Sequence, residues 1–273
     1  MSKIENYKHP LRFYLLATII PWSFWSLAGY LSHQPTSNQL LVSLLGFMGL
    51  IAPAMVAFWL IGRDRTLLDD FKNRVFNFGE IRAVYLFLAL FLMPISILTA
   101  QAISLLLGYS ASQFIITGEY SFSSGVFPVL FLLIVAPIIE EIAWHSYGTD
   151  ALRSRFNLLN TSLIFALFWG LWHIPLSSIE GYYQSNIANE SWVYGVNFLV
   201  SIFPFVIIMN WLYYKTGRNM IIPIIFHITA GYFNEIFSTH PDSKVIQTAL
   251  LMLFACWIVW RERGFFLDKL DDV

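Results

Sequence analysis

Two adjacent glutamates, Glu140 and Glu141, lie near the end of an apolar run that begins around Val126. A carboxylate inside hydrocarbon is costly unless protein groups pair or solvate it, so such a pair indicates a functional site. Successive residues of an α-helix point about 100° apart. The two side chains therefore cannot face one cavity squarely, and we expect one to do the chemistry and the other to orient it.

Two histidines in later apolar runs are the candidate partners. His173 follows Trp169 by four residues, which puts both on one helix face. His227 shares a face with Gly231 and Asn234. Either histidine alone is compatible with packing or with an interhelical hydrogen bond. At 1.5 Å per residue, the glutamates and the histidines lie roughly 9 to 18 Å from the same membrane surface, so we expect them to line one cavity.

A carboxylate and two imidazoles around a wet cavity favour hydrolysis. A buried glutamate can serve as general base for water, and histidines can donate hydrogen bonds to the oxyanion of a tetrahedral intermediate. Glu140, His173 and His227 also match the ligand types of a zinc site, although the sequence has no His-Glu-x-x-His run. We therefore expect a site without a cofactor, with zinc on these three residues as the alternative.

The composition is that of a membrane protein. Of the 273 residues, 57% are hydrophobic and 12% are charged, against about 25% charged in a typical soluble domain. No linker divides the chain, and no basic stripe indicates nucleic acid. We predict an all-α, polytopic protein with a single domain over residues 1–273, catalytic helices within about 126–239, and contacts with membrane lipid. Eight apolar segments are long enough to cross a bilayer, approximately at residues 13–31, 40–61, 83–107, 126–147, 161–176, 194–214, 221–239 and 245–260.

The basic residues fall on one side of this arrangement. With a cytoplasmic N-terminus, all of the 16 Lys and Arg residues except Lys244 lie inside, as the positive-inside rule requires. Both termini are therefore predicted to be cytoplasmic, and we expect a prokaryotic cell membrane as the location. The stretch from Arg63 to Arg82 is interpreted as a solvated loop at the lipid headgroups.

Three ordered motifs resemble a known family, the CAAX protease and bacteriocin-processing (Abi) intramembrane proteases. Within it the chain is most similar to the Ras-converting type II CAAX prenyl endopeptidases and their archaeal homologues. The family pattern is Glu-Glu-x-x-x-Arg, then an aromatic residue-x-x-x-His, then His-x-x-x-Asn, each on its own transmembrane helix. Here Glu140 and Glu141 match the first motif, Trp169 and His173 the second, and His227 the start of the third.

The resemblance implies an activity and a substrate. Glu140 with His173 would activate the attacking water, while His227 and the residue four positions later would stabilise the oxyanion. The substrate would be a C-terminally prenylated CAAX protein that loses its last three residues. A lipidated substrate of this kind suits a cavity reached from the cytoplasmic side, since the prenyl chain partitions into the bilayer.

Two positions depart from the family pattern. His145 stands where the family has arginine, which removes a permanent cation beside Glu141. Gly231 occupies the oxyanion asparagine position and has no side chain to donate. We expect weakened activity, with Asn234 as the candidate substitute donor and with Glu141, His145 and Trp169 as supporting residues. The alternatives are a non-catalytic bacteriocin-immunity or scaffold-type protein of the same fold, a zinc-dependent protease, and a proton-coupled transporter.

Overall fold

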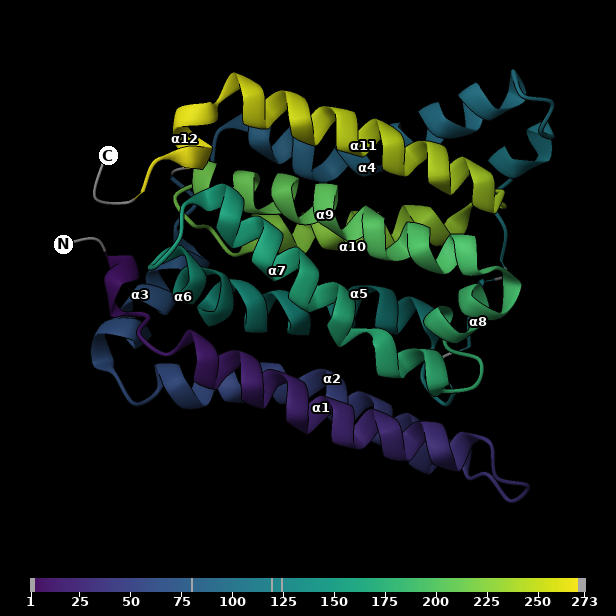
Figure 1. Ribbon diagram of the computed structural model, residues 1–273, viewed down its shortest axis with the longest axis horizontal. Helices are drawn as coiled ribbons and strands as arrows, with labels where there is room; N and C mark the ends of the chain where they lie inside the picture. Colours follow the sequence, from purple (N-terminus) through teal and green to yellow (C-terminus); the bar gives the residue numbers. More distant parts are fainter. Residues whose placement is uncertain (1–2, 80, 119, 124, 270–273) are drawn as a thin grey trace.

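The computed structural model describes residues 3–79, 81–118, 120–123 and 125–269, and within these ranges the regular secondary structure is helical. The long helices lie side by side in one bundle (Figure 1). They are α1 Pro10–Ser32, α2 Gln39–Ile61, α4 Ala83–Leu105, α5 Val129–Ala143, α7 Leu158–Trp172, α9 Trp192–Lys215, α10 Ile221–Ile236 and α11 Pro241–Arg261.

The eight predicted apolar segments are all helical, so the all-α polytopic prediction is confirmed. Among the described residues, seven helical stretches are long and apolar enough to cross a membrane, and α10 is a shorter apolar helix. The fifth segment, predicted at about 161–176, begins three residues earlier, at Leu158. Its first turn is capped by the Asn157 side chain, whose Oδ1 accepts from the Asn160 backbone N–H at 2.8 Å.

Helix α5 continues without a break through a π-helix, η3 Trp144–Gly148, into α6 Thr149–Arg153. A π-helical turn inserts one extra residue, which leaves backbone carbonyls without their usual intrahelical donors. Other described short helices are η1 Lys3–Asn6, α3 Arg65–Phe76, η2 Ala111–Phe114, η4 Ile174–Ser178, α8 Tyr183–Glu190 and α12 Arg263–Leu267.

Helix α3 corrects the prediction of a solvated loop between Arg63 and Arg82. Leu67, Asp70 and Arg74 are buried on one face of this helix, and the two charged residues are each only 3% exposed. Their spacing of three and four residues puts them on a single stripe. The basic and acidic residues of this stretch are therefore structural partners as well as surface charges.

Aromatic side chains fill the space between the helices that carry the predicted site. Trp144 packs edge-on against Trp172 with ring centroids 5.2 Å apart, and Trp172 packs against Trp25 at 4.5 Å. All three indoles are at most 1% exposed. This packing fixes α5 and its π-helix against α7 and the N-terminal helix pair.

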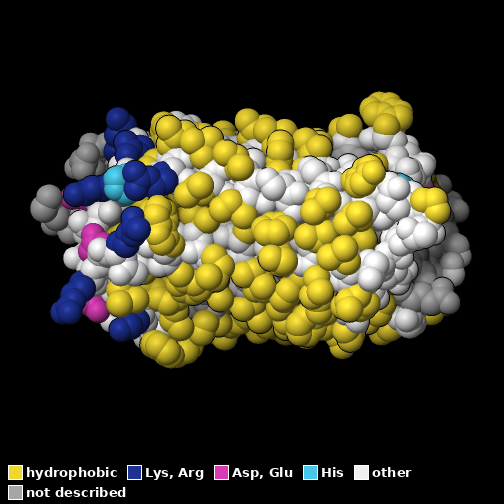
Figure 2. All heavy atoms as spheres, turned by 90° about the horizontal axis from the view of Figure 1, so that it is seen from below, with side chains coloured by type: hydrophobic (Ala, Val, Ile, Leu, Met, Phe, Trp, Pro, Cys, Tyr) yellow, Lys and Arg dark blue, Asp and Glu magenta, His cyan; other side chains and the backbone are white. Residues whose placement is uncertain are grey.

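The charges gather at one end of the bundle. On the face shown in Figure 2, Lys and Arg side chains lie at one end, and hydrophobic side chains predominate along the middle of the face. The first and last described helices, η1 and α12, lie at that same end (Figure 1). This asymmetry is consistent with the predicted orientation, in which the basic end faces the cytoplasm.

Single-cysteine labelling tests this orientation. In a Cys256→Ser background, Arg63→Cys lies exposed at the basic end and Glu190→Cys lies exposed at the opposite end. A membrane-impermeant maleimide applied to intact cells should label Glu190→Cys, whereas Arg63→Cys should react only after the cells are opened. The reverse pattern would show that the chain is inserted the other way.

Candidate active site

Glu140 and Glu141 face different surroundings. Glu140 is 8% exposed and lines a cavity of about 610 Å³. Glu141 has no exposed surface and is not part of the cavity wall. The direction of each side chain follows from the turn of about 100° between successive helical residues.

Trp169 connects Glu140 to His173. Its indole N–H donates to Glu140 Oε2 at 3.0 Å, and its backbone carbonyl lies 2.6 Å from His173 Nδ1. A carbonyl oxygen can only accept, so Nδ1 of His173 carries a proton. In the neutral ring, Nε2 then has a free lone pair and can take a proton from water.

Glu141 is clamped between two histidines. His145 Nδ1 lies 2.5 Å from Oε2, and His227 Nδ1 lies 2.7 Å from Oε1. Each carboxylate oxygen therefore has its own imidazole partner, one from the same helix and one from α10. His227 in turn lines the cavity. Glu141 thus holds the His227 ring in place, and Nε2 of that ring is available to a substrate.

A chain of hydrogen bonds fixes the protons of His145. Ser162 Oγ donates to the Leu158 carbonyl at 2.9 Å, so it accepts from Asn210 Nδ2 at 2.9 Å. Asn210 Oδ1 consequently faces His145 Nε2 at 3.0 Å and requires a proton there. His145 thus bridges Glu141 and Asn210 through its two ring nitrogens, at the position where the family pattern has arginine.

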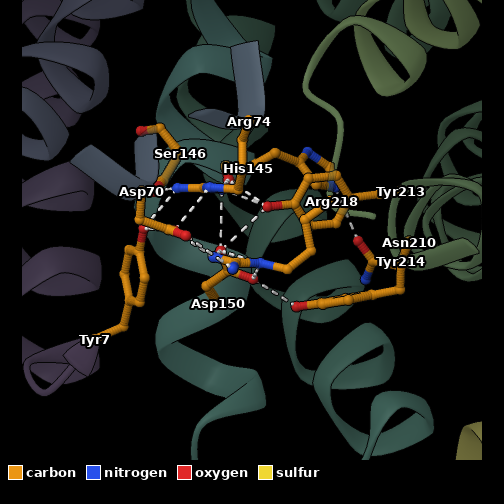
Figure 3. Close-up of polar contacts among 10 residues, drawn as sticks. All are labelled: Tyr7, Asp70, Arg74, His145, Ser146, Asp150, Asn210, Tyr213, Tyr214 and Arg218. Carbon is orange, nitrogen blue, oxygen red and sulfur yellow. Dashed lines mark hydrogen bonds and ion pairs between the residues drawn. The ribbon is translucent and has the colours of Figure 1, made fainter. Parts of the chain in front are cut away.

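The π-helix is held by Arg74 from α3, as Figure 3 shows. Arg74 donates to the backbone carbonyls of His145 at 2.7 Å and Ser146 at 2.9 Å. These are carbonyls of the π-helical turn, where the intrahelical ladder is disturbed. Arg74 therefore stabilises the local backbone that aims the His145 side chain at Glu141.

Arg74 belongs to a buried network in which charges of both signs alternate (Figure 3). It pairs with Asp70 at 2.9 Å and with Asp150 at 3.0 Å. Arg218 pairs with the same two carboxylates at 2.8 and 2.5 Å. Tyr7 from the N-terminal segment and Tyr213 and Tyr214 from α9 also donate to the aspartates. Because these ion pairs offset its desolvation by burial, the pKa of the Arg218 guanidinium lies well above its usual value and the group stays charged.

The structure brings the sequence-predicted residues to this one region. Glu140, Trp169, His173, His227, Gly231 and Asn234 all line the cavity, whereas Glu141 and His145 support it from behind. Asn234 Nδ2 already donates to the Ala230 carbonyl at 2.9 Å, so it would have to turn to reach a substrate. Glu235 also lines the cavity.

Sequence reasoning missed Arg74, Asp150 and Asn210. Asn210 lies inside a predicted apolar segment. A polar residue at that depth is unusual, and this could have marked it as a partner of the site. The two charged residues lie at helix ends, where charges are ordinary, and nothing in the sequence pairs them.

The residues considered as zinc ligands do not form a ready metal site in the described part of the chain. Within the described residues, no group of three or more His, Cys, Asp or Glu side chains is arranged to hold a metal ion. The Nδ1 atoms of His173 and His227 are engaged by the Trp169 carbonyl and by Glu141. A metal at this site would therefore have to be bound through the remaining ring nitrogens and Glu140.

Comparisons with known proteins agree with these motifs. The family model described as Type II CAAX prenyl endopeptidase Rce1-like matches residues 122–233. A protein named CAAX prenyl protease 2, from Methanococcus maripaludis, is 37% identical over 270 residues. The match covers 98% of this chain and 99% of that protein.

Replacing Arg74 tests the supporting network. Arg74→Met keeps the apolar stem but leaves Asp70 and Asp150 with Arg218 as their remaining cation. Breaking a buried pair in this way is expected to lower the free energy of unfolding by about 3 to 5 kcal/mol. Arg65→Met, at an exposed position of the same helix, should cost less than about 0.5 kcal/mol. Equal losses in the two variants, measured by denaturant unfolding in detergent, would contradict this assignment.

Proposed function

This chain belongs to the family of type II CAAX prenyl endopeptidases, and we propose that it is an intramembrane protease in which Glu140 activates the attacking water. One observation carries the proposal. Glu140, His173 and His227 line a single cavity among membrane-spanning helices, and each is held by a protein hydrogen bond that leaves another polar atom free.

The proposed reaction uses the free atoms of these three residues. Water bound between Glu140 Oε1 and His173 Nε2 attacks the scissile carbonyl carbon, and its proton passes to Glu140. The carbonyl oxygen becomes an oxyanion that accepts from protonated His227 Nε2. Collapse of the intermediate breaks the C–N bond, and Glu140 returns the proton to the leaving amine. His227 Nδ1 stays bonded to Glu141 throughout, so the ring enters the reaction already oriented.

The proposed substrate is a C-terminally prenylated CAAX protein that loses its last three residues. The wall of the cavity supports this class because it combines the polar cluster with a large apolar surface. A prenyl chain gains from such burial at about 0.8 kcal/mol per CH₂. The apolar lining includes Phe47, Leu50, Phe127, Leu132, Leu133 and Met93.

We further propose a prokaryotic cell membrane as the location and the cytoplasmic leaflet as the source of the substrate. Polar lining residues beyond the reactive cluster, including Ser121, Tyr183 and Glu190, belong to the end of the bundle away from the basic residues. If the basic end is cytoplasmic, the substrate must therefore enter sideways through the bilayer, led by its prenyl chain. If the chain is inserted the other way, the cavity opens directly to the cytoplasm, and the labelling experiment above distinguishes these routes.

Removing the Glu140 carboxylate should abolish turnover. Glu140→Ala in detergent or lipid vesicles is expected to leave no measurable cleavage of a farnesylated CAAX peptide, because the variant lacks the carboxylate that takes the proton from water and returns it to the leaving amine. Glu190→Gln, which removes an exposed carboxylate of the same cavity, is the matched control and should retain cleavage. Full activity of Glu140→Ala would refute the mechanism.

Restoring the missing oxyanion donor should raise the rate. A Cβ at Gly231 would meet the Leu133 side chain at 3.6 Å, an ordinary contact, so a side chain can begin there without a clash at its Cβ. One such donor is worth about 10² to 10³ in rate in a protease, and kcat should rise in that direction. Gly195→Asn, a glycine of α9 with open space around it, controls for the change of residue. An unchanged kcat for Gly231→Asn would remove the oxyanion assignment.

Gly231 also supports a second candidate function, a non-catalytic immunity or scaffold protein of the same fold. This function would be favoured if neither the parent chain nor Gly231→Asn cleaves any prenylated peptide while a stable partner protein copurifies. The zinc mechanism would replace the metal-free one if a strong chelator removes activity and added zinc restores it.

A further inference from the structure

We propose that Lys244 binds the C-terminal carboxylate of the substrate, a subsite that rests on the proposed peptidase function. Lys244 lies in the first turn of α11 and lines the same cavity as Glu140 and His227. It is also the one basic residue that the charge analysis leaves away from the basic end. Lys244 would thus recognise the end of the peptide, whereas Glu140, His173 and His227 cleave it.

The charges of the cavity wall point to this role. Apart from the histidines, the charged residues of the described lining are Glu140, Glu190, Glu235 and Lys244. A peptide that ends in a free carboxylate brings another negative charge into this largely apolar space. Such a charge is costly unless it is paired and hydrogen-bonded. Lys244 is the only Lys or Arg among these lining residues, so it is the available partner.

The surroundings of Lys244 leave its ammonium group available. Its Nζ lies 3.7 Å from Glu235 Oε1, which is longer than a hydrogen bond. Glu235 is held from the other side, because its Oε2 accepts from the Ser121 backbone N–H at 3.0 Å and from Ser121 Oγ at 2.8 Å. The Lys244 side chain is 20% exposed. It can therefore turn its N–H donors toward a second carboxylate without leaving Glu235.

The spacing along α10 matches the length of the leaving peptide. Eight residues separate His227 from Glu235, which is about 12 Å along the helix axis. Three residues of extended peptide span at most about 10 to 11 Å. A scissile carbonyl at His227 therefore puts the carboxylate of a leaving tripeptide near the Glu235 and Lys244 pair. Lys244 would select both the free carboxylate and the number of residues that precede it.

Binding to a variant that cannot turn over provides the test. In the Glu140→Gln background, the Kd of a farnesylated CAAX peptide is measured as the free acid and as the C-terminal amide, in detergent micelles. Because a hydrogen bond to a charged group contributes about 1.5 to 3 kcal/mol, the acid should bind roughly tenfold to a hundredfold more tightly. Lys244→Gln should remove this preference by weakening acid binding alone, and Lys244→Arg should retain it.

Matched controls separate recognition from a structural role. Lys215, paired with Glu262 at 2.5 Å and similarly part-exposed, lies at the other end of the bundle, and Lys215→Gln should keep the preference for the acid. A purely structural role of Lys244 would weaken both peptides equally or lower the melting temperature, and either result overturns the proposal. So does equal binding of acid and amide, or no saturable binding of either, in the starting variant. Cleavage by the parent chain without a preference for the acid would refute this subsite and leave the peptidase function standing.

Discussion

The fold depends on keeping Glu141 charged and fully paired inside a membrane-spanning helix. Two imidazoles, from His145 and His227, each occupy one of its oxygens. This clamp ties α5 to α10 and orients His227 toward the cavity. Further polar groups offset the desolvation of these buried side chains. Asn210 bonds to the His145 ring, and Arg74 holds the π-helical backbone that carries it. A half-satisfied network at this depth would be worse than an apolar one; both oxygens of Glu141 and both ring nitrogens of His145 are paired, and His227 Nε2 faces the cavity.

The adjacent Glu140 has the opposite environment. Trp169 donates to its Oε2, and the carboxylate lies at the cavity wall. The same tryptophan orients His173 through its backbone carbonyl. A catalytic carboxylate must keep a hydrogen-bonding atom free for its substrate. A carboxylate that only positions other residues must have all of its atoms paired. Two neighbouring glutamates meet these opposite requirements because the helix turns them apart.

Much of this could be predicted from the sequence. The eight helices follow from hydropathy, because in lipid every backbone group must be satisfied within its own segment. The glutamates and histidines stand out because ionisable residues at that depth are rare. Helix α3 could not be recognised, since the burial of Asp70 and Arg74 depends on Asp150 and Arg218, which are distant in sequence. Asn210, which bonds to the His145 ring from a helix distant in sequence, was beyond a local pattern.

The most direct test of the account compares the two glutamates in one experiment. Melting temperature and cleavage of a farnesylated peptide are measured on the same preparations of Glu140→Gln and Glu141→Gln. The account predicts that Glu140→Gln melts at or above the temperature of the parent chain and cleaves nothing. Glu141→Gln should melt at a lower temperature, because it loses the charge that both histidines pair with. Cleavage by Glu140→Gln at the rate of the parent chain would contradict the central claim.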